Sequence, residues 1–359
     1  MNMNDAKKII RQNSHLLNLL RFYKEIDKSE LSRRLQISMP TVYNALEELT
    51  KINFVKKDEQ KNTSINSEFG TLVGISIGTS LCKISFLDLK FELFSDERFL
   101  AHKNNLICKI EESISDKVLL NKCANDMSKN YIYFKTPKVF AELKVILNDI
   151  FEYLRENIEN NSLNILSIGI SCTGLVNNKT QTILDAYNLS YLNNLTLDAL
   201  IFPGMQNFFD ERDIYVCLVQ NSNASVIAEK ISLYQENSSH KKKENIISLY
   251  LGVGTGSGIY LGKLYGGTSG FAGEAGHTRA PICENEEDLK HHKDLIDKGI
   301  IDAECTCGCN DCYDYKIRSY VFEMTATKFC DMSSDEIRKY LEENPIKAKL
   351  FGKYLGNMI

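Results

Sequence analysis

The glycine-rich stretch at residues 251–267, LGVGTGSGIYLGKLYGG, is the most informative segment of this chain. It is followed by GEAGH at 273–277 and by CTCGCNDC at 305–312. A glycine-rich turn on its own indicates little more than a tight bend of the backbone. Here the turn is followed by a glutamate, a histidine and four cysteines, and that order makes the signal specific.

Toward the N-terminus from this stretch, predicted strands alternate with helices. Apolar runs predict strands at 72–77, 81–87, 91–100, 163–170, 214–219 and 246–251, and helices at 139–158 and 224–234. Two turns are candidate ligand contacts. GISIGTS at 74–80 joins the first two strands, and VQNSNA at 219–224 opens a helix whose free N–H groups could hold a polar ligand. The region is predicted to be a mixed α/β domain.

The first 66 residues show a different pattern, that of helices followed by two short strands. Apolar residues at spacings of three and four predict one amphipathic helix over 7–24. Ser29 and Ser38 are placed to cap two shorter helices, and Pro40 is tolerated in the first turn of the second. The inward stripe of this second helix consists of Val42, Ala45, Leu46 and Leu49. Residues 54–57 and 63–65 read as a two-stranded wing. We therefore predict a winged helix-turn-helix over 1–66, with a domain boundary near residue 67.

DNA is the expected partner of this unit. Residues 1–66 hold 12 Lys and Arg against 8 Asp and Glu, whereas the whole chain has 43 against 47. A basic N-terminal unit of this kind is suited to bind a polyanion. The start of the second short helix can reach base edges while basic side chains hold phosphates. The candidate DNA contacts are Arg33, Ser38, Thr41, Tyr43, Asn44 and Lys61, with Arg34, Lys56 and Lys57 as further phosphate contacts. Glu47 and Glu48 would repel phosphate. The alternative is a helical protein-interaction domain whose basic residues are only solvated.

The whole chain resembles the ROK family of repressors and sugar kinases, and in particular its xylose-repressor-like regulators. The resemblance is strongest over 252–314 and continues in GISCTGLV at 169–176, in Asn188–Leu189 and in the loop at Asn221. It implies that residues 67–359 form an actin-like (ribonuclease H-like) sugar-kinase fold, with a ligand cleft between two lobes. It also implies a sugar site, formed by Asn188, Asn221, Glu274, His277 and Asp314, the last replacing the family's usual glutamate.

The resemblance further implies a structural zinc ion held by His277, Cys305, Cys307 and Cys312, because one imidazole and three thiolates make a closed tetrahedral site. Cys309 is an extra thiol, and Asp311 stands where the family has glycine. The charged segment 283–304 is longer than the family's. His291 and His292, which lie within it, are expected to be solvated.

Three departures from the family's kinases point away from phosphotransfer. Ser76 and Ser222 stand where the kinases have aspartates, and a serine cannot accept a hydroxyl proton as a carboxylate does. Thr79 replaces a glycine of the first phosphate loop. The chain also ends at Ile359, before the elements that complete the second lobe in the family, so we expect that lobe to be C-terminally truncated.

These features predict a sugar-responsive transcriptional regulator, a repressor rather than an enzyme, with a role in xylose metabolism. The alternatives are an active hexose kinase that uses ATP, and a decayed regulator that binds DNA but senses nothing. A homodimer or homotetramer is expected, because one short recognition helix reads too few bases alone.

A cytoplasmic location and no membrane contact are expected, because no stretch has the ~20 apolar residues of a membrane helix and the N-terminus lacks a signal peptide. Five scattered cysteines are expected to be buried or free thiols: Cys82, Cys108, Cys123, Cys172 and Cys217.

Overall fold

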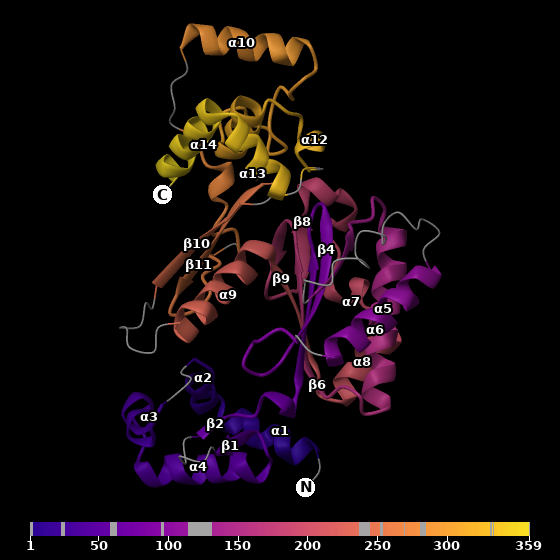
Figure 1. Cartoon of the computed structure of the whole chain (residues 1–359), viewed down its shortest axis with the longest axis vertical. Coiled ribbons are helices and arrows are strands. Elements are labelled where there is room, and N and C mark those ends of the chain that lie inside the picture. Colours follow the sequence, from indigo (N-terminus) through magenta and orange to yellow (C-terminus); the bar gives the residue numbers. More distant parts are fainter. Residues whose placement is uncertain are drawn as a thin grey trace.

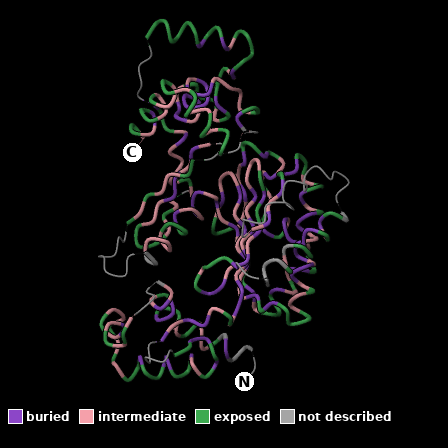
Figure 2. Tube along the Cα trace, viewed as in Figure 1, coloured by how far each residue is buried: buried purple, intermediate pink, exposed green. Residues whose placement is uncertain are grey.

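The computed structural model of the chain describes residues 3–22, 26–57, 63–94, 97–113, 131–236, 245–251, 254–268, 270–280, 285–330, 332 and 334–358. Figure 1 shows three parts along the long axis: N-terminal helices at one end, a sheet with flanking helices in the middle, and C-terminal helices at the other end. In Figure 2 buried residues follow the central sheet and continue into the N-terminal helices.

The N-terminal part consists of four helices and a small antiparallel sheet. Its elements are α1 (Met3–Gln12), α2 (Ser14–Phe22), α3 (Lys28–Leu35), α4 (Met39–Lys51), β1 (Val55–Lys57) and β2 (Thr63–Ile65). The single helix predicted over 7–24 is wrong, since two helices meet at Asn13, whose side-chain Nδ2 donates to the Ile9 carbonyl at 2.9 Å. A local bond of this kind competes with regular helix geometry. Tyr23 and Lys24 lie outside the described residues.

The caps of α3 and α4 mark the two ends of the turn between these helices. Asp27, not Ser29, caps α3, because its carboxylate accepts from the Glu30 amide at 2.8 Å. The left-handed Gln36 (φ 56°) ends α3. Ser38 caps α4 as predicted, its Oγ accepting from the Thr41 amide. The predicted inward stripe of α4 is buried.

The central sheet has the strand order β5-β4-β3-β6-β9. Its strands are β3 (Thr71–Ile77), β4 (Leu81–Leu87), β5 (Ile132–Lys135), β6 (Ile165–Cys172) and β9 (Tyr215–Gln220). β3, β4 and β5 pair antiparallel, whereas β3, β6 and β9 run parallel. The helices α5 (Glu97–Ser113), α6 (Phe140–Glu159) and α8 (Pro203–Glu211) lie on one side of the sheet, and α9 (Asn221–Glu236) lies on the other (Figure 1). The hairpin, the strands at β6 and β9 and the helices α6 and α9 follow the sequence prediction within a few residues.

The strand predicted over 91–100 is wrong. The Asp88 carboxylate accepts from the amides of Lys90 and Glu92, and Phe91 is left-handed (φ 62°), so the chain turns after β4. Helix α5 follows from Glu97, and the sheet's third antiparallel strand is β5.

Short elements follow β6 along the chain and lead to α8. They are β7 (Leu175–Asn177), β8 (Thr182–Asp185), the 3-10 helix η3 (Tyr187–Leu192) and α7 (Leu197–Leu200). In the second lobe α9 packs on the antiparallel pair β10 (Asn245–Leu251) and β11 (Thr255–Leu261). Glycine is required here, because a Cβ on Gly258 would lie 2.3 Å from the Ser222 carbonyl at the start of α9.

The C-terminal part is helical. Its elements are η4 (Ala275–His277), α10 (Glu286–Asp297), α11 (Tyr313–Lys316), the π-helix η5 (Ile317–Phe322), α12 (Ala326–Cys330), α13 (Ser334–Glu343) and α14 (Pro345–Met358). The long charged segment forms α10, which is mostly exposed (Figure 2). His291 is exposed as expected. The expectation for His292 is wrong, because its ring is buried, stacks on Tyr320 and hydrogen-bonds the Tyr315 hydroxyl at 2.9 Å.

Candidate functional site: a metal-ligating cluster beside a polar cavity

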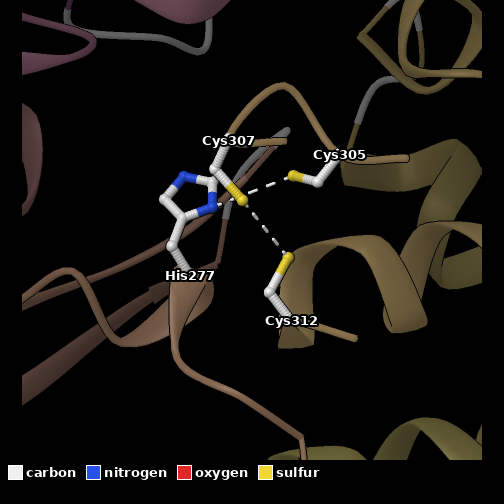
Figure 3. Close-up of side chains that lie close together, drawn as sticks. All are labelled: His277, Cys305, Cys307 and Cys312. Atoms are coloured by element: carbon white, nitrogen blue, oxygen red, sulfur yellow. Dashed lines mark hydrogen bonds between the residues drawn. The ribbon is translucent and has the colours of Figure 1, made fainter. Parts of the chain in front are cut away.

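His277 and three cysteines converge from separate loops (Figure 3). His277 ends η4, Cys305 and Cys307 lie on the loop after α10, and Cys312 caps α11. Their ligand atoms all lie within 4.8 Å of one another. His277 Nδ1 is 3.8 Å from Cys305 Sγ, and Cys307 Sγ is 3.8 Å from Cys312 Sγ. The exposed Cys309 is not part of this group.

Backbone hydrogen bonds and one side-chain ion pair hold these loops together. The Ala280 amide donates to the Asp311 carbonyl at 2.8 Å, and Arg279 Nε pairs with the Asp311 carboxylate at 2.7 Å. Asp311 thus ties the segment after His277 to the segment before Cys312. Gly308 is left-handed (φ 81°) and lets the Cys305 amide reach the Cys309 carbonyl at 2.7 Å.

The donor set fits a tetrahedral metal. Zinc–ligand bonds of ordinary length place two sulfurs about 3.8 Å apart and a nitrogen and a sulfur about 3.5 Å apart. Both 3.8 Å contacts are close to these values. Hydrogen bonds from Cys312 and His277 lower the pKa of the Cys305 thiol, which favours a thiolate at this one ligand. The cluster is therefore compatible with a structural zinc ion.

A polar cavity adjoins the cluster. Its lining residues are Tyr187, Asn188, Gly254, His277, Cys305, Thr306, Asp314, Arg318, Ala326 and Phe329. Of the five predicted sugar contacts, the cavity brings together Asn188, His277 and Asp314. Tyr187 and Asn188 belong to η3 of the first lobe, and the remaining lining residues come from the second lobe and the C-terminal part. The cavity thus lies where these parts meet.

Asp314 is fixed at the centre of this arrangement. Its Oδ1 accepts from the Thr255 amide at 2.8 Å, and its Oδ2 lies 3.9 Å from His277 Nε2. Burial raises the pKa of the Asp314 carboxyl. Glycines at 254 and 276 make room for it, since a Cβ on Gly276 would lie 2.5 Å from Asp314 Oδ1.

The other two predicted sugar contacts do not line this cavity. Glu274 Oε1 accepts from Gln220 Nε2 at 2.7 Å, a bond between β9 and the loop before η4. Asn221 lies at the start of α9, where its Oδ1 is buried without a hydrogen-bond partner among the described residues.

Ser76 and Ser222 were expected to replace the aspartates of the family's kinases, and the structure shows the surroundings of both side chains. Ser222 is buried at the start of α9, and its Oγ has no partner in the described part of the chain. Ser76 is half-buried on β3. Both positions are therefore occupied by neutral hydroxyls.

Four lining residues were not singled out from the sequence: Tyr187, Arg318, Ala326 and Phe329. Arg318 follows Asp314 by four residues, about one helical turn, and that spacing is a usable signal. Tyr187 directly precedes Asn188 and packs edge-on to the His277 ring, with centroids 5.7 Å apart.

The predicted DNA contacts of α3 and α4 that the structure describes are exposed, including Arg33. Ser38, Thr41, Tyr43 and Asn44 are exposed, and Lys28 Nζ lies 4.8 Å from the centre of the Tyr43 ring. Lys61 lies outside the described residues.

Three of the basic residues predicted to contact phosphate already have acidic partners. Arg33 and Arg34 both bind Glu30 and lower the pKa of its carboxyl to about 2. Lys56 Nζ lies 2.8 Å from Glu68 Oε2. Phosphate contacts by Arg33, Arg34 or Lys56 therefore require exchange of partners.

The scattered cysteines within the described part, Cys82, Cys108, Cys172 and Cys217, are free thiols as predicted. Cys123 lies outside that part. Among the described helices none is both long and apolar enough to cross a lipid bilayer.

Comparison with known proteins gives consistent results. The profile of the ROK family matches residues 118–359. A xylose repressor of Caldicellulosiruptor bescii is 25% identical over 265 residues, which are 71% of this chain and 55% of that repressor. A xylose repressor of Bacillus spizizenii is 22% identical over 347 residues, 92% of this chain and 73% of that one. An N-acetyl-D-glucosamine kinase of Aliivibrio salmonicida is 36% identical, but over only 23% of this chain. The chain spans little more than half the length of the first of these repressors.

A solved structure covers most of the chain. It is a ROK family transcriptional regulator described as a homologue of the E. coli MLC protein, with a TM-score of 0.57 at 16% identity over 95% of this chain and 78% of that one. The likeness shows a mixed α/β fold of the actin-like sugar-kinase type, as predicted.

Proposed function

We propose that this chain, which belongs to the ROK family, is a sugar-responsive transcriptional repressor that binds operator DNA through residues 1–66 and a sugar in the cavity at Asp314. The names of its relatives favour a repressor, and xylose is the first sugar to test. Operator DNA lies in the cytoplasm, so this function requires the chain to be there.

The outer face of α4 carries the proposal. Thr41, Tyr43 and Asn44 project from the first turns of a helix that follows a short turn and precedes a hairpin, the arrangement of a winged helix-turn-helix. Hydroxyl and amide side chains at these positions can bond to base edges in the major groove. A homodimer or homotetramer would place two such helices on a palindromic operator.

We infer that the sugar is bound without being phosphorylated. A hexose kinase that uses ATP needs a general base beside the sugar hydroxyl, and this typically contributes ~10² to 10⁴ in rate. Ser222 and Ser76 provide no carboxylate. The proposed zinc ion, with His277, Cys305, Cys307 and Cys312 as its ligands, would hold the cavity in shape and take no part in chemistry.

Two measurements on the full chain test this function. Selection of bound sequences from random DNA, followed by titration with xylose and other sugars, should give a palindromic site whose affinity changes when sugar is added. A coupled assay with ATP and a panel of hexoses should give no sugar-dependent turnover. Turnover would favour the kinase alternative, and DNA binding that no sugar alters would favour a regulator that no longer senses.

A further inference from the structure

Gln220 lies at the carboxyl end of a parallel strand of the central sheet. It is the last residue of β9, its backbone pairs with Cys172 of β6, and α9 begins at the next residue. The residue is only 7% exposed. Ligands of open α/β sheets bind outside the carboxyl ends of the parallel strands. A buried amide at this position is therefore placed to act on a binding site.

The side chain of Gln220 is joined to the second lobe. Its Nε2 donates to Glu274 Oε1 at 2.7 Å, across the space between β9 and the loop before η4. Buried polar groups are hydrogen-bonded in nearly all proteins, and a bond to a carboxylate is stronger than one between neutral groups. This bond therefore holds a second-lobe loop against the first-lobe sheet.

Glu274 passes this restraint on to the cavity. It directly precedes η4, and its carbonyl accepts from the His277 amide at 3.2 Å. On the other side, the Gly273 carbonyl accepts from the Ser257 amide at 2.7 Å and from Ser257 Oγ at 3.0 Å. The segment that ends at His277 is thus fixed by Ser257 within the second lobe and by Gln220 from the first lobe.

His277 is the part of this segment that lines the cavity. Its ring lies edge-on to Tyr187 of the first lobe, with ring centroids 5.7 Å apart, and Asn188 follows on the same wall. The proposed zinc ion would fix His277 within the second lobe only. The bond from Gln220 to Glu274 instead fixes this wall relative to the first lobe, and so helps to set the width of the cavity.

We propose that Gln220 is a positioning residue for sugar binding. Its amide holds Glu274, and through it the loop that carries His277, so that His277 and Asn188 face a sugar from opposite walls. Gln220 itself does not touch the sugar. This inference rests on the proposed function, because it assumes that the cavity takes a sugar.

Calorimetric titration of the full-length chain tests the inference, with whichever of xylose, glucose, mannose and N-acetylglucosamine binds most tightly. Gln220→Met keeps a side chain of similar length without the donor, and should weaken sugar binding about 10-fold. Gln220→Glu should weaken it further, because two carboxylates at this distance repel each other. Gln206→Met is the matched control. It removes a bond of the same kind, from Gln206 Nε2 to Asp210 Oδ1 at 2.9 Å on α8, and should leave sugar affinity unchanged.

Exchange of the two side chains distinguishes positioning from direct contact with the sugar. Gln220→Glu combined with Glu274→Gln restores an amide–carboxylate bond with donor and acceptor reversed. The melting temperature should recover, and sugar affinity should return to within about three-fold of wild type. Recovery of the melting temperature without sugar affinity would mean that the Glu274 carboxylate itself binds the sugar, and would overturn the positioning role.

The outcomes also separate this inference from the proposed function. Wild-type sugar affinity in Gln220→Met, measured at a temperature where the variant is folded, would overturn the inference and leave a sugar-responsive repressor intact. Operator binding by a wild-type chain that binds none of the four sugars would contradict both. If Gln220→Met does not fold, hydrogen exchange of the wild-type chain decides. Sugar should slow exchange at the end of β9 and in η4 together, and protection of only one of them would refute the tie.

Discussion

At the scale of single residues, glycines of this region lie in close contact with Asp314 in the cavity and with Ser222 at the start of α9. Glycines at 254 and 276 border the Asp314 carboxylate, and glycines at 256 and 258 border Ser222. The glycines therefore allow close approach between backbone and side chains, as well as tight turns. Even one added methyl group at such a site has a measurable effect, because protein interiors are densely packed.

Gly276→Ala should destabilise the second lobe and weaken sugar binding. The new Cβ would lie 2.1 Å from the Thr255 carbonyl and 2.5 Å from Asp314 Oδ1, so both groups must move. Overpacking of this kind typically costs about 1–3 kcal/mol. Gly352→Ala is a matched control, because nothing lies within 4 Å of its Cβ on helix α14. It should be neutral or stabilise by up to about 1 kcal/mol. Equal melting temperatures for the two variants would contradict this account of the cavity.

Thr41→Ala with Asn44→Ala should remove operator preference and spare non-specific DNA binding. These side chains are exposed on α4 and are proposed to contact base edges, each contributing about 1–3 kcal/mol of discrimination. Lys57→Ala, which removes an exposed charge on β1, should instead weaken operator and random DNA alike. Fluorescence anisotropy with both DNAs at two salt concentrations separates these effects. Equal losses on both DNAs in the double variant would mean that another face reads the bases.

At the scale of elements, the sequence predicts best where one local pattern is decisive. The cap at Ser38, the hairpin β3–β4 and helix α6 each follow from spacing or turn chemistry alone. The break at Asn13 and the turn at Phe91 depend on side-chain bonds to the backbone, and an apolar count does not detect them. His292 is buried because α10 folds over two tyrosines that lie more than twenty residues away in the sequence.

The candidate site could be predicted in part for the same reason. His277 and the three cysteines are close because short loops carry them, and the family resemblance identifies them. Arg318 and Tyr187 enter the cavity through the packing of η5 and η3, and their sequence signals are weaker: a four-residue spacing from Asp314 and a position next to Asn188.

Ser38 caps α4 and is also proposed to contact DNA, and substitution can separate these two roles. Ser38→Ala removes the cap of α4, which should cost about 1 kcal/mol of stability. Ser38→Asp keeps a capping oxygen, so thermal unfolding should stay close to wild type. Its added charge should nevertheless weaken DNA binding, because it would face phosphate. Wild-type DNA affinity in Ser38→Asp would show that Ser38 is a cap and not part of the DNA surface.

At the scale of the whole molecule, a metal in the cysteine cluster would join distant segments. Its four ligands come from η4 and from the loop that leads into α11, and the same loops carry His277 and Asp314 into the cavity. A closed tetrahedral zinc site contributes directly to folding free energy. The cavity should therefore depend on the metal even though the metal performs no chemistry.

Cys312→Ser should lower zinc content from one ion per chain, destabilise the second lobe and abolish sugar binding. Structural zinc contributes ~10–16 kcal/mol of apparent binding free energy in small peptides, which is comparable with the ~5–15 kcal/mol stability of a typical domain. Cys309→Ser is the control, because Cys309 is exposed and outside the cluster. It should keep both zinc and sugar binding. Elemental analysis that finds no zinc in the wild-type chain would refute this role for the cysteines.

The hydrophobic core of the N-terminal helices continues into the central sheet. Leu89, in the turn after β4, is fully buried in their hydrophobic cluster, and Leu72 and Leu166 of the central sheet pack against it. Arg11 also pairs with Asp213, and Arg21 lies 5.6 Å from the centre of the Phe91 ring. The sheet therefore supports the proposed DNA-binding unit by direct contact.

Leu89→Ala should consequently weaken operator binding from outside residues 1–66. Truncating a fully buried leucine typically costs about 2–5 kcal/mol, and here the lost packing falls on the helices that hold α4. Leu93→Ala lies four residues along the same turn, where the side chain is 40% exposed, and should cost less than about 1 kcal/mol. Operator affinity and sugar affinity are measured on both variants at a temperature where each remains folded. Loss of operator affinity with normal sugar binding in Leu89→Ala alone is the expected result. Parallel loss of both affinities would mean that Leu89 stabilises the central sheet rather than the N-terminal helices.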